Sequence, residues 1–280
     1  MVEYYYQKTR GKIKMQMLDI INTAARAAEG FAEELRHAFT SAVILAGGTG
    51  TRMGKLPGQE NAVTKQFLTL DGEPVILRTI KQFEACESID EIVLVVREEE
   101  KALYSPMLRE AGIHKVTKIT AGGITRQESA EAGLRAVSDR CKFIAIHDGA
   151  RPLITPEQIT LVAKEAYRIG AAAAASRAKD TTKLTDGNRY VEQTPDRNSV
   201  WNAATPQIFK VEEYRAAVYT GKENGTAVTD DCSLVEALGF PVRMVDTGYQ
   251  NLKITTREDL YFARAVLALR AEEKNSDETV

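Results

Sequence analysis

The sequence has few cysteines and few prolines, and these shortages exclude several kinds of protein. Its 280 residues contain 3 cysteines and 8 prolines. Cys86, Cys141 and Cys232 are widely separated, so they show neither the paired spacing of a zinc site nor a disulfide framework. No proline-rich stretch marks a low-complexity linker. We therefore predict a globular protein of a reducing compartment, the cytoplasm.

The sequence also lacks long apolar runs and an excess of either charge. No segment approaches the roughly 18 to 20 apolar residues of a membrane-spanning helix, and no apolar signal core follows the N-terminus. The 37 basic residues nearly cancel the 39 acidic ones. Because the protein has almost no net charge, it lacks an overall electrostatic field that would attract nucleic acid or an anionic membrane, and we expect neither as a partner. Any anion must be bound by a local basic site.

The remaining composition, with 44% hydrophobic residues, predicts one large α/β domain. We expect three regions, namely an N-terminal helical extension over residues 1–40, a main domain over 41–270 and a flexible tail over 271–280. Within residues 1–40, apolar residues recur at spacings of three and four, which is typical of one helix face. These residues are Leu18, Ile21, Ala25, Ala28, Ala32, Leu35 and Phe39.

Strand and helix patterns alternate after residue 41. Strands are predicted at 42–45, 91–96, 115–120, 142–146 and 171–177, and helices at 75–85, 98–111, 126–137 and 156–169. This alternation predicts a Rossmann-like three-layer α/β/α fold with a mainly parallel sheet and ligand loops at the carboxyl ends of its strands. The turn at 186–188 predicts a β-hairpin that projects as an arm over about 178–200.

A glycine-rich loop follows the first strand. Ala46, Gly47 and Gly48 open it, and its backbone can approach a phosphate closely. It matches neither the Walker pattern nor the dinucleotide fingerprint. Arg52 and Lys65 supply two cations that such a loop can fold around a polyphosphate.

Two further loops follow strands. Gly122 and Gly123 precede a helix, where a base or sugar can be gripped, and Arg126 is interpreted as a solvated residue near the helix start. Asp148 ends a strand at the position expected for a magnesium ligand, with a turn or helix cap as the other interpretation. We interpret the neighbouring His147 as a core histidine. On residue type alone, Arg197 and Lys253 do not differ from ordinary surface charges.

The ordered set of motifs resembles the 2-C-methyl-D-erythritol 4-phosphate cytidylyltransferase family. The motifs are LAGGTGTRMG, KQF, AGGITRQESAEAGL, HDGARP, DTTK, TPDRNSVW, ATPQIF, TDDCSLVEALG and NLKITTREDL. The resemblance implies CTP and a polyol phosphate as substrates, Mg²⁺ or another divalent cation as cofactor, and a homodimer that exchanges its arms. The products are 4-diphosphocytidyl-2-C-methyl-D-erythritol and pyrophosphate, in the non-mevalonate isoprenoid pathway.

The resemblance also assigns roles to individual residues. It implies nucleotide contacts from Ala46, Gly47, Gly48, Gly122, Gly123 and Ser129. It implies that Arg52 and Lys65 face the triphosphate and that Asp148 holds the metal. The twelve residues between Arg52 and Lys65 form a longer loop than is usual in the family, so Lys55 is an alternative phosphate contact. The polyol phosphate would be surrounded by Arg151, Thr181, Arg197, Thr229 and Lys253, with Thr181 and Arg197 donated by the arm of the partner subunit. Arg52, Lys65, Arg197 and Lys253 are the expected catalytic residues.

Three alternatives remain at this point. A ribitol 5-phosphate cytidylyltransferase of cell-wall polymer synthesis has a similar first loop and HDGARP segment, although the DRNSVW run favours methylerythritol phosphate. A catalytically silent nucleotide-binding scaffold is the alternative from another class. A dehydrogenase is the weakest, because Arg97 stands where that fold needs an acidic residue after the second strand.

Overall fold

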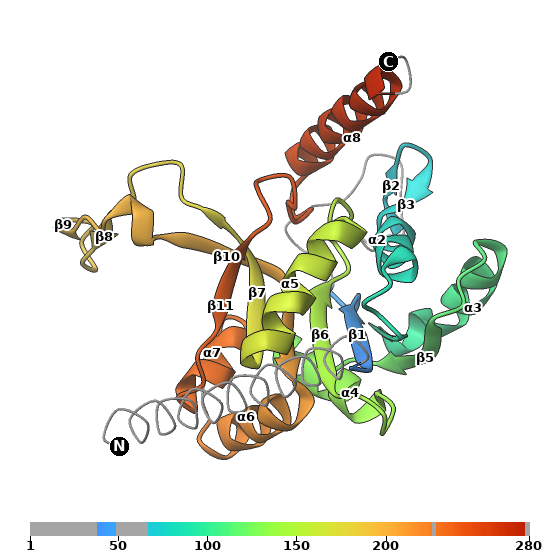
Figure 1. Ribbon diagram of the computed structural model, residues 1–280, viewed down its shortest axis with the longest axis horizontal. Helices are drawn as coiled ribbons and strands as arrows, with labels where there is room; N and C mark the ends of the chain where they lie inside the picture. Colours follow the sequence, from blue (N-terminus) through green and yellow to red (C-terminus); the bar gives the residue numbers. More distant parts are fainter. Residues whose placement is uncertain (1–37, 49–66, 226–227, 278–280) are drawn as a thin grey trace, which may run out of the picture. The chain divides into compact units, whose positions relative to one another are not determined.

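A seven-stranded mixed sheet organises the computed structural model, which describes residues 38–48, 67–225 and 228–277. The strand order is β11-β7-β10-β6-β1-β4-β5 (Figure 1). The strands are β1 (Thr40–Leu45), β2 (Thr69–Leu70), β3 (Glu73–Pro74), β4 (Glu91–Val96), β5 (Val116–Ala121), β6 (Phe143–Asp148), β7 (Ala171–Arg177), β8 (Leu184–Thr185), β9 (Val191–Gln193), β10 (Trp201–Lys210) and β11 (Arg243–Asp246). The helices are α2 (Val75–Ala85), η3 (Glu98–Glu100), α3 (Lys101–Glu110), α4 (Arg126–Ala136), α5 (Pro156–Ile169), η4 (Arg197–Ser199), α6 (Val211–Glu223), α7 (Asp231–Ala237) and α8 (Arg257–Asp277).

The central strands are buried on both faces, which explains their nearly continuous apolar runs. β1 pairs in parallel with β4 on one side and with β6 on the other. Successive side chains of a strand point to opposite faces. Val43 of β1 packs in a core cluster with residues of α4, α6 and α7, while Thr79 and Phe83 of α2 contact β6 and the loop after it. Helices therefore cover both faces, and the predicted three-layer fold is confirmed.

β10 is the antiparallel member of the sheet, between β6 and β7. It is antiparallel to β7 because the chain leaves β7, forms the β8–β9 hairpin and returns directly along β10, as a hairpin connection requires. Figure 1 shows β8 and β9 projecting well beyond the ends of the sheet strands. The hairpin turn is closed by Asp186, whose carboxylate accepts hydrogen bonds from the backbone N–H groups of Asn188 and Tyr190.

The strand and helix predictions agree closely with this structure. The alanine run at 171–177 is a strand, as predicted, because Gly170 ends α5 at a φ of 102° and the alanines lie buried between β10 and β11. The predicted tail over 271–280 differs, since α8 continues through Asp277, and Ala271, Glu272 and Glu273 are good helix formers. The predicted extension over 1–40 falls almost entirely outside the described residues. No helix in the described ranges is long and apolar enough to cross a membrane.

Helix α4 lies so close to the sheet that one of its positions admits only glycine. A Cβ added at Gly133 would overlap Val43 Cγ1 and approach Val95 Cγ2 to 3.1 Å. We expect Gly133→Ala to lower the free energy of unfolding by about 1 to 3 kcal/mol in urea denaturation, because overpacking outweighs the better helix propensity of alanine. Gly187→Ala, with no atom within 4 Å of its added Cβ, is the matched control and should change stability by less than about 0.5 kcal/mol. A Gly133→Ala protein as stable as the wild type would contradict this packing.

Candidate active site

Three loops begin side by side where the parallel strands end. Leu45 of β1 is in register with Asp148 of β6, so the loop opened by Ala46 starts beside that aspartate. The N–H of Ala46 donates to the carbonyl O of Val95 in β4, and the N–H of Gly122 donates to Val96 O. The chain continues from β1 to β4 on one side, whereas β6 lies on the other. The loops therefore flank the point where strand order reverses, the usual ligand crevice of such sheets.

The loop after β5 is shaped by its glycines and by Ser129. A Cβ added at Gly122 would lie 2.6 Å from Ser129 Oγ, and one at Gly123 would overlap Glu128. The Ser129 hydroxyl is 3.2 Å from the N–H of Gly123, from which it accepts, and it donates to Thr125 O at 3.0 Å. The hydroxyl thus holds the loop against the start of α4, leaving the Gly123 backbone exposed.

Asp148 is the centre of the site, and three cations surround its carboxylate. Lys253 Nζ lies 2.8 Å from Oδ2, Arg151 Nε lies 3.4 Å from Oδ2, and Arg126 Nε lies 3.3 Å from Oδ1. We call these four residues the Asp148 cluster. Burial alone would raise the pKa of Asp148, but Lys253, Arg126 and Arg151 together lower it below its ordinary value. The carboxylate is therefore ionised at neutral pH.

The structure corrects the interpretation of Arg126 as a solvated residue near a helix start. Its side chain is 31% exposed, and its Nη1 lies 2.7 Å from Oδ2 of Asp231, which is itself only 1% exposed. Burial opposes the charge of Arg126, but Asp231 and Asp148 raise its pKa overall. In the sequence, Asp231 falls within the TDDCSLVEALG motif, but the cap of α7 is its neighbour Asp230. No local pattern marks Asp231, because its partner lies 105 positions away.

His147, next to Asp148 at the end of β6, is fully buried. This confirms its interpretation as a core histidine. Its Nε2 lies 3.4 Å from the carbonyl O of Arg151 and its Nδ1 lies 3.1 Å from Thr205 Oγ1. A carbonyl can only accept, so Nε2 carries the proton and Nδ1 accepts from the Thr205 hydroxyl. That hydroxyl in turn accepts from the N–H of Asp148 at 3.0 Å. Burial lowers the pKa of His147 to about 3, and the ring is neutral.

The other predicted site residues fall into three groups. Lys253 and Arg151 lie in the Asp148 cluster, and Arg151 also donates from Nη1 to Asn251 O at 2.8 Å. Thr181 and Arg197 are exposed on the projecting arm, where Arg197 Nη1 donates to Lys179 O. Thr229 is exposed just before α7.

Some predicted site residues lie at positions that the structure does not describe, and one prediction concerns a metal site. Arg52 and Lys65, like the alternative Lys55, lie outside the described residues, and Gly48 is the last described residue of the first loop. Among the residues that are described, no group of three or more His, Cys, Asp and Glu could hold a metal ion. Asp148 is therefore not part of such a group within these ranges.

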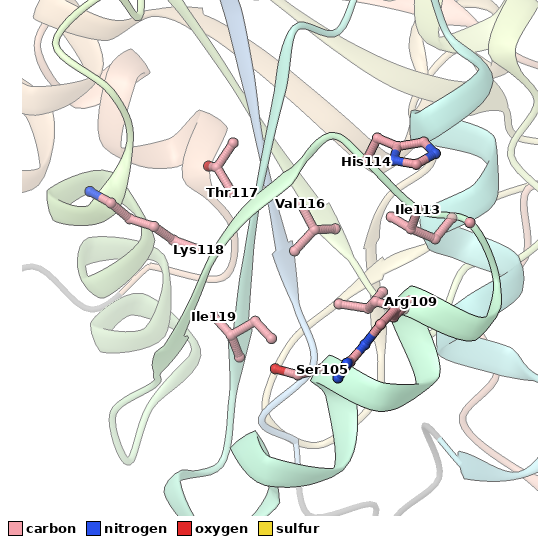
Figure 2. A pocket seen from close by; sticks show the side chains of 10 residues that line it. Ser105, Arg109, Ile113, His114, Val116, Thr117, Lys118 and Ile119 are labelled. Carbon is pink, nitrogen blue, oxygen red and sulfur yellow. The ribbon is translucent and has the colours of Figure 1, made fainter.

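A separate pocket of about 460 Å³ lies between α3 and the edge strand β5 (Figure 2). Its lining includes Ser105, Arg109, Ile113, His114 and Ile119. β4 and β1 separate β5 from β6, the strand that carries Asp148. The pocket is therefore not part of the Asp148 cluster, whose cations mark the site best suited to an anionic ligand.

The chain is similar to known proteins over most of its length. The family model for 2-C-methyl-D-erythritol 4-phosphate cytidylyltransferase (IspD) matches residues 40–269. The protein of that name from Geobacillus kaustophilus is 42% identical over 232 residues, covering 83% of this chain and 98% of the relative. The one from Desulforamulus reducens is 42% identical over 230 residues, covering 82% and 96%. The structure of 4-diphosphocytidyl-2C-methyl-D-erythritol synthase from Anaerococcus prevotii superposes with a TM-score of 0.73 at 30% identity, covering 82% and 96%.

The neutral, buried His147 predicts a pH dependence of stability. Its pKa is lowered in the folded state from 6.5 to about 3, so its contribution to stability is fully present above pH 6.5 and is lost as the pH falls toward 3. Between pH 6.5 and pH 5 this group should reduce the free energy of unfolding by about 2 kcal/mol. Urea denaturation across that range should show a flatter profile for His147→Gln than for wild type. His114→Gln, at an exposed histidine, is the control and should keep the wild-type slope.

Proposed function

Because the chain belongs to the 2-C-methyl-D-erythritol 4-phosphate cytidylyltransferase (IspD) family, we propose that it joins CTP to 2-C-methyl-D-erythritol 4-phosphate. The products are 4-diphosphocytidyl-2-C-methyl-D-erythritol and pyrophosphate. One observation carries the proposal: the Asp148 cluster gathers three cations beside two glycine loops at the crevice of the sheet. This arrangement suits a ligand with several phosphates.

In the proposed reaction, a phosphate oxygen of the polyol phosphate attacks the α-phosphorus of CTP. The bond from the α-phosphorus to the bridging oxygen breaks, and that oxygen leaves with its electron pair as part of pyrophosphate. Positioning and charge stabilisation supply most of the catalysis in such transfers, so no protein nucleophile is required. Lys253 and Arg151 orient the attacking phosphate, while Arg52 and Lys65 stabilise charge on the triphosphate. Gly122, Gly123 and Ser129 shape the contact for the base and ribose.

The Asp148 carboxylate fits a divalent cation that takes its other ligands from phosphate and water. Mg²⁺ is commonly bound by one or two carboxylates together with substrate phosphates, and Asp148 offers one ionised carboxylate. When bound, Mg²⁺ neutralises phosphate charge. Lys253 Nζ and Arg151 Nε both contact Oδ2, so a cation bound there would require these two side chains to move. Both cations are long enough to turn toward the incoming phosphates and leave Oδ2 accessible.

The proposed active unit is a homodimer in which each arm completes the site of its partner. Two observations support it. Thr181 and Arg197 lie in the connection between β7 and β10 that forms the arm, and the arm exposes large apolar side chains, with Tyr190 75%, Val191 57% and Leu184 48% exposed. Covering this apolar surface with a second copy of the chain would be favourable. We further propose a cytoplasmic location, which the three free, buried cysteines support.

The ribitol 5-phosphate and scaffold alternatives are disfavoured by the family match and by the named relatives. Pyrophosphate release from CTP and Mg²⁺ tests the choice directly, with methylerythritol phosphate, ribitol 5-phosphate or no acceptor. We expect release with methylerythritol phosphate alone. Lys65→Ala and Arg52→Ala should each lower turnover by about 100-fold or more, because each removes a preorganised charge partner. Release with ribitol phosphate would reassign the substrate, and nucleotide binding without release would support a scaffold.

Subunit mixing tests the exchange of arms. Arg197→Ala and Lys253→Ala homodimers should both be nearly inactive, since each lacks a substrate contact at both sites. Mixed subunits should form heterodimers in which one of the two sites has an intact core and an intact arm. Half of a random mixture is heterodimeric, so about a quarter of wild-type turnover should return. Recovery of no activity in dimers shown to have exchanged subunits would mean that Arg197 does not act across the interface.

A further inference from the structure

Arg126 joins two buried carboxylates at the carboxyl ends of the parallel strands. Its Nε contacts Asp148 and its Nη1 contacts Asp231, so one rigid guanidinium spans the end of β6 and the start of α7. Asp148 is 7% exposed and Asp231 is 1% exposed. Burying charged groups has a large desolvation cost, and a buried ion pair is weak evidence for a purely stabilising role. A role in the site accounts better for such a bridge.

Asp231 is held from several directions, although it is not the cap of its helix. Its Oδ1 accepts from the hydroxyl of Tyr214 at 2.6 Å, and its backbone N–H donates to Gln207 Oε1 at 3.0 Å. Asp230 fills the capping position of α7 by accepting from the N–H of Ser233. Asp231 is therefore left to hold Arg126, and its own position is set by α6 and β10.

The three cations of the Asp148 cluster are not equivalent. Lys253 and Arg151 contact Oδ2, and among the described residues neither has a second carboxylate partner. Of the three cations, Arg126 is the one that contacts Oδ1, and it also pairs with Asp231. Incoming phosphates can attract Lys253 and Arg151 away from Oδ2, whereas Asp231 retains Arg126. The carboxylate then keeps its orientation while its Oδ2 becomes accessible.

We propose that Arg126, anchored by Asp231, is a positioning residue that fixes the Asp148 carboxylate so that Oδ2 faces the metal and the substrate phosphates. The inference rests on the proposed function and extends it to two residues to which the family resemblance assigned no role. Arg126 thus orients the carboxylate and stays in place, whereas Lys253 and Arg151 exchange Asp148 for the substrate phosphates.

The test compares Arg126→Gln, Asp231→Asn and the double variant in two measurements. Calorimetry without the polyol phosphate gives the CTP dissociation constant with and without Mg²⁺, and steady-state assays give kcat. We expect the gain in CTP affinity from Mg²⁺ to fall about 10-fold in both single variants, in the range seen when a group orienting a metal ligand is lost. CTP affinity without Mg²⁺ should change little, and kcat should fall about 10-fold or more. The double variant should be no worse than Arg126→Gln, because the two residues act as one unit.

Arg135→Gln is the matched control, since Arg135 lies on the same helix, is exposed and pairs only with Glu131 among the described acidic residues. It should match wild type in both measurements. Tyr214→Phe loosens Asp231 without a charge change and should reproduce a smaller loss if Asp231→Asn fails to fold. If Mg²⁺ still increases CTP affinity by the wild-type factor in Arg126→Gln and in the folded Asp231 or Tyr214 variant, the inference is overturned while the proposed function stands. A wild-type protein without any Mg²⁺ gain would overturn both this inference and the proposed metal role, whereas pyrophosphate release that fails in every protein would overturn the proposed function.

Discussion

One buried carboxylate sets the geometry of the site. Asp148 lies at the end of β6, and three cations contact it. Arg126 comes from α4, Arg151 from the loop after β6, and Lys253 from the segment before α8. An unpaired carboxylate so deeply buried would become protonated. The pairing therefore does two things at once: it keeps Asp148 ionised, and it ties together parts of the chain from residue 126 to residue 253. These segments therefore meet at one anion, at the carboxyl ends of the parallel strands.

The sheet explains why they meet there. Parallel pairing of β1 with β4 and β6, and of β4 with β5, brings the loops after β1, β5 and β6 to the same edge of the sheet. The register of Leu45 with Asp148 places the first glycine loop beside the carboxylate. The antiparallel strand β10 then brings Thr205 behind His147, where hydrogen bonds fix the backbone N–H of Asp148. The neutral histidine is thus structural support for the site and adds no charge to it.

Much of this was predictable from the sequence, because it depends on local pattern. Apolar runs and helical periods placed the strands and helices, since β1, β4 and β6 are buried on both faces and Gly170 ends α5 unambiguously. The place of Asp148 at the end of a strand was predicted from the apolar run before it. The roles of Arg126 and Asp231 were not, since a basic residue at a helix start and an acid after a cap are usually solvated. Only the tertiary fold brings them together, as it brings Lys253 to Asp148.

Charge balance connects the free protein to the proposed reaction. Asp148 and Asp231 offset two of the three cations Arg126, Arg151 and Lys253, so this part of the site carries one excess positive charge. Without Asp148, the cations would repel one another and drift apart, and without the cations Asp148 would not stay charged. Substrate phosphates can replace Asp148 as partners of Lys253 and Arg151 with little net change in pairing. The internal anion thus holds Arg126, Arg151 and Lys253 together at the position proposed for the substrate phosphates, and electrostatic catalysis relies on charges that are placed in advance of the reaction.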